Sequence, residues 1–333
     1  MSPRHTAPRT SRAGHAVTRR SLLTMLAAAG MSFAARPARA GTSKVKNVER
    51  STLGTTFTLE LDHAPFPHGG EPDQDRTVLA FVPAAFKVER GGRVPLLVHF
   101  HGHRTTADKA IAAHELREQL VDSKQNAVLL VPQGPVNAVD SSAGSLEAPG
   151  GFARMIDEAL RVLVSADARH ALGRRAVRPG TVCLSAHSGG YHAAACCLKA
   201  GGVDVREVYL FDALYGDLGT FRDWVKDGRA AGTRHKLVSY YGAGATEANS
   251  DWLEEELTRA KVNTAYERHE GTLSREDIVR ADALFIRTQV AHDGVTHELN
   301  ALRDCLCAST LPRHLATAWF EAKTGARKLE RRR

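Results

Sequence analysis

The feature that most constrains this chain is a short apolar run, Thr181 to Gly190, that ends in a serine followed by two glycines. A run with helical composition, Tyr191 to Ala200, follows directly. This order is typical of a buried strand, a sharp turn and a helix, with the Ser188 hydroxyl held out at the turn. The glycines behind the serine allow the unusual backbone geometry that such a turn requires. The stretch therefore predicts an exposed serine between a strand and a helix.

Strand-like and helix-like segments alternate along most of the chain. We expect strands at 56–61, 77–82, 94–100, 127–131, 180–185, 205–211, 236–241 and 284–290, and helices at 107–121, 152–164, 191–200, 250–261 and 297–307. This alternation predicts an α/β fold with a mostly parallel central sheet and helices on both faces. Ligands of such sheets bind beyond the carboxyl ends of the strands. Ser188, Asp212, His292 and the segment 101–104 all fall at those ends.

The pattern Ala-x-Ser-x-Gly around Ser188 differs by one small residue from Gly-x-Ser-x-Gly. Between a strand and a helix, this pattern resembles the α/β-hydrolase superfamily of serine esterases and lipases. The resemblance spans most of residues 50–310. It implies one three-layer domain, which we expect over residues 45–322, and hydrolysis by an activated serine.

A serine hydroxyl needs a neighbouring base to take its proton and an acid to orient that base. In the superfamily these groups follow in the order serine, acid, histidine. The resemblance assigns the acid to Asp212, at the tip of an apolar strand where an unpartnered carboxylate would be costly. The superfamily more often takes its acid after the following strand. The loop there offers Glu247 as the alternative, whereas Asp251 is more typical of a helix start.

The base is expected after the last strand, between Val290 and His297. His292 comes off that strand ahead of a glycine and the closing helix, where the superfamily places its histidine. His297 is the alternative, and it could instead cap the helix or pack against it. Because the chain contains 16 histidines, position rather than residue type supports this assignment.

The negative oxygen that develops during acyl transfer needs fixed donors, which are usually backbone N–H groups. The resemblance assigns one donor to Gly189, directly after the serine. It assigns the second to His103, which follows a His-Gly pair at the end of the strand 94–100. Arg104, the next residue, is either a site for an anionic group or an ordinary surface arginine.

Three histidines, at 99, 101 and 103, favour a rival interpretation. On an extended strand they would face one side, and His-x-His is a spacing found in zinc sites, which His187 or His192 could complete. However, a glycine should break the strand before the last of the three, and no Cys or Asp lies close in sequence. We therefore expect no metal and no other cofactor.

A long segment rich in Gly, Ser and Pro, from Gln133 to Gly151, is expected to overhang the same edge of the sheet. A loop of this length in a compact domain is usually functional or disordered. Asn137 and Asp140 are its candidate substrate contacts, and a merely mobile surface loop is the alternative.

Residues 1–40 are predicted to be an export signal outside the fold. They contain seven arginines and no acid, and Arg19-Arg20 precede an apolar run to Ala35 and a cleavage-like Ala38-Arg39-Ala40. These features are typical of a twin-arginine secretory signal, and an arginine-rich disordered tail is the alternative. The apolar run is too short to span a bilayer. We expect a bacterial protein that the twin-arginine machinery exports folded, periplasmic or extracellular, without stable membrane insertion.

The formal net charge of +8 is concentrated at the two ends. The tail 323–333 holds six basic groups and one acid, so the part between residues 41 and 322 has a net charge of −4. An acidic body does not favour nucleic acid as a partner. The tail is expected to be a solvated end or to contact an anionic surface.

Five cysteines are too few for a disulfide scaffold. Cys183 is expected to be a buried thiol on the central strand. One bridge is possible in an oxidising compartment, with its pairing left open.

Taken together, the sequence predicts an exported serine hydrolase that cleaves a small-molecule or polymeric carboxylic ester through an acyl-enzyme. A peptidase or amidase with the same triad, and a non-catalytic binding protein of the same fold, are the alternatives. A metal hydrolase would differ from all three in losing its activity to a chelator.

Overall fold

The computed structural model describes residues 42–70, 72–166, 172–173, 176–269 and 272–314. The predicted export signal, residues 1–40, and the basic tail 323–333 lie outside the described residues, so both remain predictions.

A ten-stranded sheet is the centre of the fold, in the order β1-β2-β3-β5-β4-β6-β7-β8-β10-β9. The strands are β1 (Lys44–Arg50), β2 (Gly54–Glu60), β3 (Thr77–Pro83), β4 (Arg93–Phe100), β5 (Val128–Pro132), β6 (Arg178–His187), β7 (Val205–Phe211), β8 (Lys236–Tyr241), β9 (Thr264–Glu267) and β10 (Ala283–Arg287). The pairs β1/β2, β2/β3 and β3/β5 are antiparallel, and all other neighbouring pairs are parallel.

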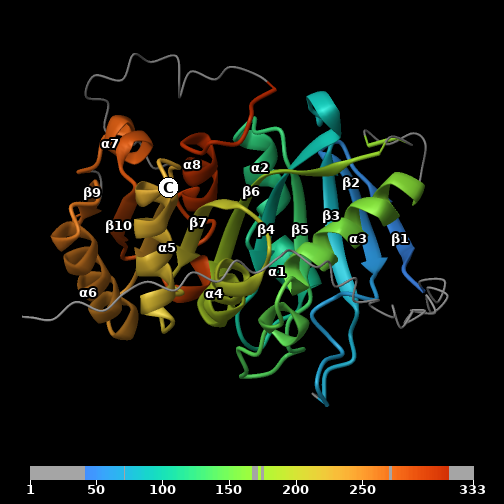
Figure 1. Ribbon diagram of the computed structural model, residues 1–333, viewed down its shortest axis with the longest axis horizontal. Coiled ribbons are helices and arrows are strands. Elements are labelled where there is room, and N and C mark those ends of the chain that lie inside the picture. The colour runs from blue at the N-terminus through green and yellow to red at the C-terminus, as the bar shows by residue number, and fades with distance from the viewer. Residues whose placement is uncertain (1–41, 71, 167–171, 174–175, 270–271, 315–333) are drawn as a thin grey trace, which may run out of the picture. The chain divides into compact units, whose positions relative to one another are not determined.

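Helices cover both faces of the sheet (Figure 1). One face packs against α3 (Gly151–Ala166), α4 (Tyr191–Ala200), α5 (Leu218–Ala230) and α6 (Ala245–Arg259). The other packs against α1 (Ala107–Ala113), α2 (Leu116–Asp122), α7 (Arg275–Arg280) and α8 (Ala301–Cys307). The predicted fold class, a mostly parallel α/β sheet with helices on both faces, is confirmed.

The central strands are mostly apolar because both of their faces are buried. In β4, Leu96 and Val98 belong to one core and Leu97 belongs to the core on the opposite face. The same division runs through β6, where Leu184 and Cys183 face opposite sides. This rigid centre fixes the strand ends from which the candidate site is built.

The structure corrects several predicted boundaries. The helix expected at 107–121 is two helices, because Glu115 has a φ of 49° and interrupts the helical backbone. The strand expected at 284–290 ends at Arg287. The helix expected at 297–307 begins only at Ala301, after Asn300 with a φ of 56°. His292 therefore lies in a connecting segment, several residues beyond its strand.

Other helices and strands of the structure begin at different residues than predicted or are not predicted at all. Helix α6 begins at Ala245, ahead of the predicted residue 250, and a short 3-10 turn (Gly144–Glu147) interrupts the long loop after β5. Strands β1 and β9 and helices α5 and α7 are not among the predicted elements. Strand β1 is mostly exposed and β9 has four residues at the sheet edge, so neither carries a clear apolar pattern.

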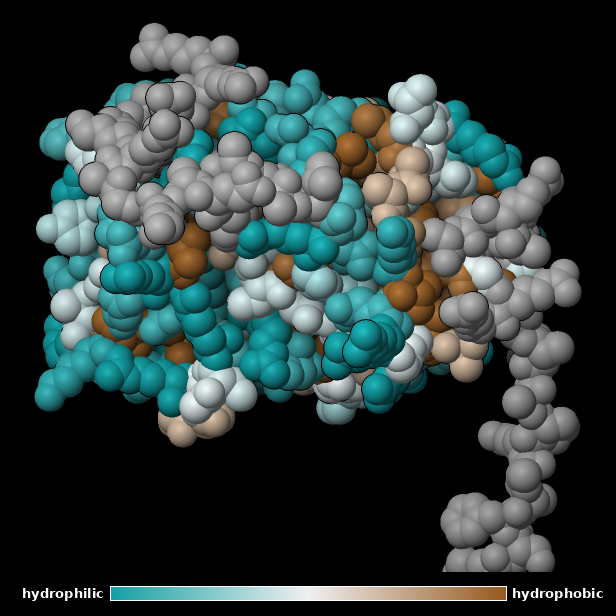
Figure 2. Space-filling model, turned by 90° about the horizontal axis from the view of Figure 1, so that it is seen from above, coloured by the Kyte–Doolittle hydropathy of each residue, from teal (hydrophilic) through white to brown (hydrophobic). Residues whose placement is uncertain are grey.

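The cysteines are all free thiols, and Cys183 is buried on β6 as predicted. The one disulfide that the sequence left open is therefore absent from the described structure. Among the described residues, no helix combines the length and apolar character needed to cross a membrane. Hydrophilic side chains cover most of the visible protein surface in Figure 2, with hydrophobic ones in separate patches between them.

Phe152 offers a test of the packing between α3 and the sheet. Its side chain is fully buried, and its ring centroid lies 6.5 Å from that of Phe100 at the end of β4. We expect Phe152→Ala to lower the free energy of unfolding by about 3–5 kcal/mol, because it removes buried apolar surface and leaves a cavity. Urea denaturation of the region from residue 41 onward would measure this. Tyr266→Ala is the control, since Tyr266 is 55% exposed, and a loss of equal size there would contradict the packing argument.

Candidate active site

The predicted site residues follow strands that run in the same direction, so they meet at one edge of the sheet. Ser188 follows β6, Asp212 follows β7, and the segment 101–104 follows β4. The loops after β2 and β5, blue and green at the lower edge of the sheet in Figure 1, extend from this same edge.

Ser188 lies on a tight turn between β6 and α4. Its φ is 50°, in the left-handed region that non-glycine residues rarely adopt. The turn is packed directly against the end of β4. A Cβ on Gly102 would lie 2.8 Å from the Cβ of Ser188, and one on Gly190 would lie 2.4 Å from the carbonyl oxygen of Phe100. Only glycine allows this close approach, so the two loops hold each other in place.

Asp212 and His292 are hydrogen-bonded to each other. The Nδ1 of His292 lies 2.6 Å from Oδ2 of Asp212, although the two residues are 80 positions apart. The other carboxylate oxygen, Oδ1, accepts hydrogen bonds from the Thr246 hydroxyl and from the Gly242 N–H at 3.2 Å. The carboxylate is thus held from two sides, and it fixes the orientation of the His292 ring.

The hydrogen bond between Asp212 and His292 favours the charged form of each side chain. Partial burial would raise the pKa of Asp212, but the hydrogen bonds from His292, Thr246 and Gly242 outweigh burial and lower it. The hydrogen bond to Asp212 raises the pKa of His292 against the opposing effect of burial. Asp212 therefore carries its negative charge at neutral pH and stabilises a proton on the histidine.

His187, the residue before the serine, connects the serine turn to the histidine loop. Its Nε2–H donates to the backbone carbonyl of His292 at 2.9 Å, and the two ring centroids are 4.7 Å apart. On its other side the His187 ring lies 4.6 Å from that of His114 on the loop between α1 and α2. Burial lowers the pKa of His187 to about 4 and that of His114 to about 3, so both rings are neutral.

The predicted oxyanion residues, Gly189 and His103, lie against each other. A Cβ on Gly189 would come within 2.3 Å of the His103 ring. The His103 Nε2 is in turn 2.8 Å from the hydroxyl of Ser141 on the long loop. The structure thus brings both residues to the serine turn, and the donor role of their backbone N–H groups remains a prediction.

The loop after β5 is tied to the loop after β4. The N–H of Arg104 donates to the Ala138 carbonyl at 2.8 Å, and the N–H of Asn137 donates to the Thr105 carbonyl at 3.1 Å. The Asp140 carboxylate accepts from the N–H of Ser142 at 2.8 Å. Both Arg104 and Asn137 have positive φ values, 55° and 52°. The loop is therefore fastened over the site by its backbone.

The two alternatives, Glu247 and His297, are placed away from the central pair. Glu247 lies in the first turn of α6 and forms an ion pair with Arg287 at 2.9 Å. Its neighbour Thr246, rather than Glu247, contacts the Asp212 carboxylate. The His297 ring lies 6.0 Å from His114, and Asp212 bonds His292 instead.

The histidines at 99, 101 and 103 do not converge. His99 Nδ1 lies 2.5 Å from the Ser185 hydroxyl, whereas His101 Nε2 accepts from the N–H of Gly134 and His103 bonds Ser141. The rival zinc site built on these three is therefore wrong. His192, its possible fourth ligand, bonds Asp217 instead at 2.7 Å.

A cavity of about 620 Å³ opens at Ser188. Its lining includes Ser188, His292, His103, Arg104, His114 and Val139. A much smaller pocket of about 30 Å³ is lined by Gly189 together with Phe66, Phe100 and Asp140. The lining of the larger cavity combines polar and apolar surface, and Arg104 brings a positive charge to its wall.

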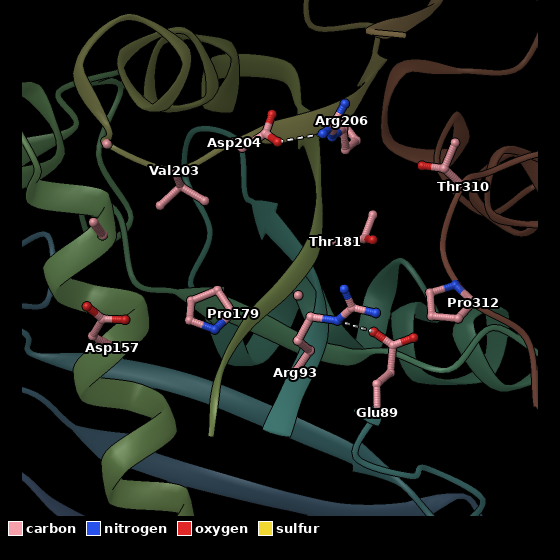
Figure 3. Close-up of a pocket in the computed structure, with 13 residues that line it drawn as sticks. Glu89, Arg93, Asp157, Pro179, Thr181, Val203, Asp204, Arg206, Thr310 and Pro312 are labelled. Carbon is pink, nitrogen blue, oxygen red and sulfur yellow. Dashed lines mark ion pairs between the residues drawn. The ribbon is translucent and has the colours of Figure 1, made fainter. Parts of the chain in front are cut away.

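A further cavity of about 540 Å³ lies at the opposite end of β6, around Pro179 and Thr181 (Figure 3). Its arginines are already paired: Arg206 lies 2.7 Å from Asp204, and Arg93 lies 3.6 Å from Glu89. Because it is at the other end of the strands, this cavity is separate from the serine and histidine.

Three contacts of the site were missed by sequence reasoning: Thr246 on Asp212, His187 on the His292 carbonyl, and Ser141 on His103. Each joins segments far apart in the sequence. Only Thr246 has a signal in the sequence, because it directly precedes Glu247, the alternative acid, and its hydroxyl donates to Asp212.

Comparison with known proteins gave matches in solved structures only. No family model matches the chain, and no curated protein matches it. An S-formylglutathione hydrolase from Agrobacterium tumefaciens is similar at 14% identity and a TM-score of 0.44, covering 80% of this chain and 98% of that one. A feruloyl esterase module from Clostridium thermocellum has 10% identity and a TM-score of 0.46, with coverage of 83% and 91%. An S-formylglutathione hydrolase from Staphylococcus aureus has 12% identity and a TM-score of 0.45, with coverage of 79% and 100%. Because these similarities are low, we base the functional proposal on this chain's own residues.

The charge coupling between Asp212 and His292 can be measured directly. We expect the pKa of His292, followed by NMR titration of its ring protons, to lie above the ordinary value of about 6.5. In Asp212→Asn the pKa should fall, because the amide carries no charge to stabilise the imidazolium, and the ring should lose its proton at lower pH. Glu247→Gln is the matched control and should leave the pKa of His292 unchanged. Equal values in Asp212→Asn and the unmodified protein would contradict the coupling.

Proposed function

We propose that this chain is a serine hydrolase that cleaves carboxylic esters through an acyl-enzyme. One observation carries the proposal. A partly buried carboxylate holds His292 by a 2.6 Å hydrogen bond, and that histidine lines the same cavity as a serine on a strained turn. Strained backbone of this kind persists where the surroundings enforce it, and it gathers at active sites. Serine, base and acid are the parts that nucleophilic acyl transfer requires.

In the proposed reaction, Ser188 Oγ attacks the ester carbonyl carbon while His292 Nε2 takes the serine proton. Asp212 holds Nδ1–H, which keeps Nε2 free for this transfer and stabilises the imidazolium that forms. The C–O bond to the leaving alcohol then breaks, and His292 returns the proton to that oxygen. Water, deprotonated by the same histidine, attacks the acyl-enzyme and releases the acid and Ser188.

The backbone N–H groups of Gly189 and His103 are the proposed donors to the developing oxyanion. Two contacts support this: the His103 ring packs on Gly189, and Ser141 holds that ring. The neutral state of His187 also supports the proposal. A second positive charge beside His292 would oppose its protonation, and burial prevents that charge at neutral pH.

The first test is labelling with a fluorophosphonate probe together with turnover of a short-chain aryl ester. We expect the protein to be labelled at Ser188 and to hydrolyse the ester. Ser188→Ala should lose the label and reduce kcat by at least about 10³-fold, because the nucleophile is gone.

Ser142→Ala, on the loop over the cavity, is the matched control and should keep both label and turnover. Folding of each variant is checked by circular dichroism. A folded protein that takes no label and cleaves no ester would overturn the proposal. Turnover that is abolished by a chelator and unaffected by Ser188→Ala would point to a metal hydrolase.

We further propose that the chain is exported folded by the twin-arginine route, on the sequence of residues 1–40 alone. The pair Arg19-Arg20, the short apolar run after it and the Ala38-Arg39-Ala40 site support this.

Replacing both arginines by lysine tests this route, since it keeps the charge of the signal and removes the arginine pair. In a bacterium with a functional twin-arginine system, we expect Arg19→Lys with Arg20→Lys to retain the uncleaved precursor inside the cell. The measurement is fractionation followed by mass analysis of the N-terminus. Arg9→Lys with Arg12→Lys is the control and should be exported normally. Normal processing of the first variant would exclude this route.

A further inference from the structure

The lining of the cavity at Ser188 includes a group of potential metal ligands. The proposed hydrolysis does not require them to bind a metal. His187, His292 and Asp293 each offer one ligand atom, and these atoms all lie within 4.8 Å of one another. Within the described part of the chain, this is the one group of three or more His, Cys, Asp or Glu side chains whose ligand atoms lie this close together. It differs from the zinc site considered from the sequence, which rested on the histidines at 99, 101 and 103.

We propose that these three residues bind a divalent transition-metal ion of the Zn²⁺ type, and that the bound ion inhibits the hydrolase. The inhibitory part rests on the proposed function, whereas the binding part rests on the ligand geometry alone.

The donor set fits such an ion. Two imidazole nitrogens and one carboxylate oxygen are ligands that Zn²⁺ accepts, and three protein ligands leave one position open to the cavity. With Zn–N distances of about 2.0–2.1 Å, tetrahedral ligand atoms lie about 3.4 Å apart. Because the ligand atoms lie within 4.8 Å of one another, each pair needs to approach by at most about 1.4 Å.

Asp293 has the freedom to make this movement. It is exposed, and within the described residues its carboxylate forms no hydrogen bond or ion pair. It follows His292 directly in the short 3-10 turn His292–Gly294, so both ligands come from one segment. His187 approaches from the end of β6, and binding would exchange its hydrogen bond to the His292 carbonyl for a bond to the metal.

Asp212 would not bind the metal itself, but it would orient the ligand His292 through their hydrogen bond. A histidine that binds a metal usually donates its other ring N–H to a carboxylate, which fixes the tautomer and the ring orientation. The hydrogen bond between His292 Nδ1 and Asp212 leaves Nε2 as the nitrogen available to an ion. The same pairing that prepares His292 as a base therefore also prepares it as a ligand.

These two uses exclude each other. A nitrogen lone pair that binds Zn²⁺ cannot accept the proton of Ser188. Because Ser188 and all three ligands line one cavity, an ion there would also occupy the space in front of the serine. Metal binding should thus suppress acyl transfer without unfolding the protein.

The experiment measures binding and inhibition separately, on protein purified without a polyhistidine tag and stripped with EDTA. Zn²⁺ binding is measured by equilibrium dialysis on the Ser188→Ala variant, which keeps all three ligands and needs no activity. Inhibition is measured as ester turnover of the unmodified protein over a series of Zn²⁺ concentrations. We expect one Zn²⁺ per chain, and loss of turnover over the same concentration range.

Asp293→Asn removes the exposed ligand and leaves the serine, base and acid in place. We expect it to keep most of its metal-free turnover and to bind Zn²⁺ at least about tenfold more weakly, with the same shift in the inhibition curve. Asp227→Asn, an exposed aspartate on α5, is the matched control and should bind and respond to Zn²⁺ as the unmodified protein does.

Each outcome decides the proposal. If Ser188→Ala binds no Zn²⁺, or if Asp293→Asn binds it as tightly as the control does, the site is wrong. If Zn²⁺ raises turnover, the inhibitory role is wrong. If one Zn²⁺ binds and Asp293→Asn weakens it, but the unmodified protein cleaves no ester, the metal site stands and the proposed hydrolysis fails.

Discussion

The arrangement of this site depends on one buried carboxylate. Asp212 directly follows β7, a strand between two other parallel strands, where an ionised side chain is costly unless it is fully hydrogen-bonded. Its partners come from different segments: His292 from the loop after β10, Gly242 from the end of β8, and Thr246 from the start of α6. Satisfying that single charge therefore draws three loops together at one edge of the sheet.

The close contact between the serine turn and the end of β4 also holds the site together at this edge of the sheet. The turn at Ser188 has a backbone conformation that costs free energy, and it is maintained because Gly102 and Gly190 let the two loops pack at backbone distance. His187 adds the third connection, from the residue before the serine to the backbone of His292. The serine turn, the histidine loop and the carboxylate are thus joined through hydrogen bonds and close packing. A displacement of one of them should therefore shift the positions of the other two.

Much of the fold could be predicted from the sequence, because the strands buried on both faces are mostly apolar. The strands 205–211 and 236–241 and the helix 191–200 have the bounds that their composition indicates. The failures have physical reasons. Helix interruptions at Glu115 and Asn300 occur where single residues adopt left-handed backbone, which carries little signal in the sequence. The exposed strand β1 and the edge strand β9 are stabilised by pairing with neighbours rather than by a recognisable pattern of their own.

By itself, the sequence determined the α/β layout, the turn at Ser188 and the set of candidate acids and histidines, because local composition and spacing specify strands, helices and sharp turns. Which of those candidates lie together was decided only by the tertiary structure. It brought His292 rather than His297 to Asp212, turned Glu247 to Arg287, and separated the histidines at 99, 101 and 103. The physical reason is that these contacts join residues up to 86 positions apart. Their geometry is set by how the strand ends and loops pack, which no local stretch of sequence encodes.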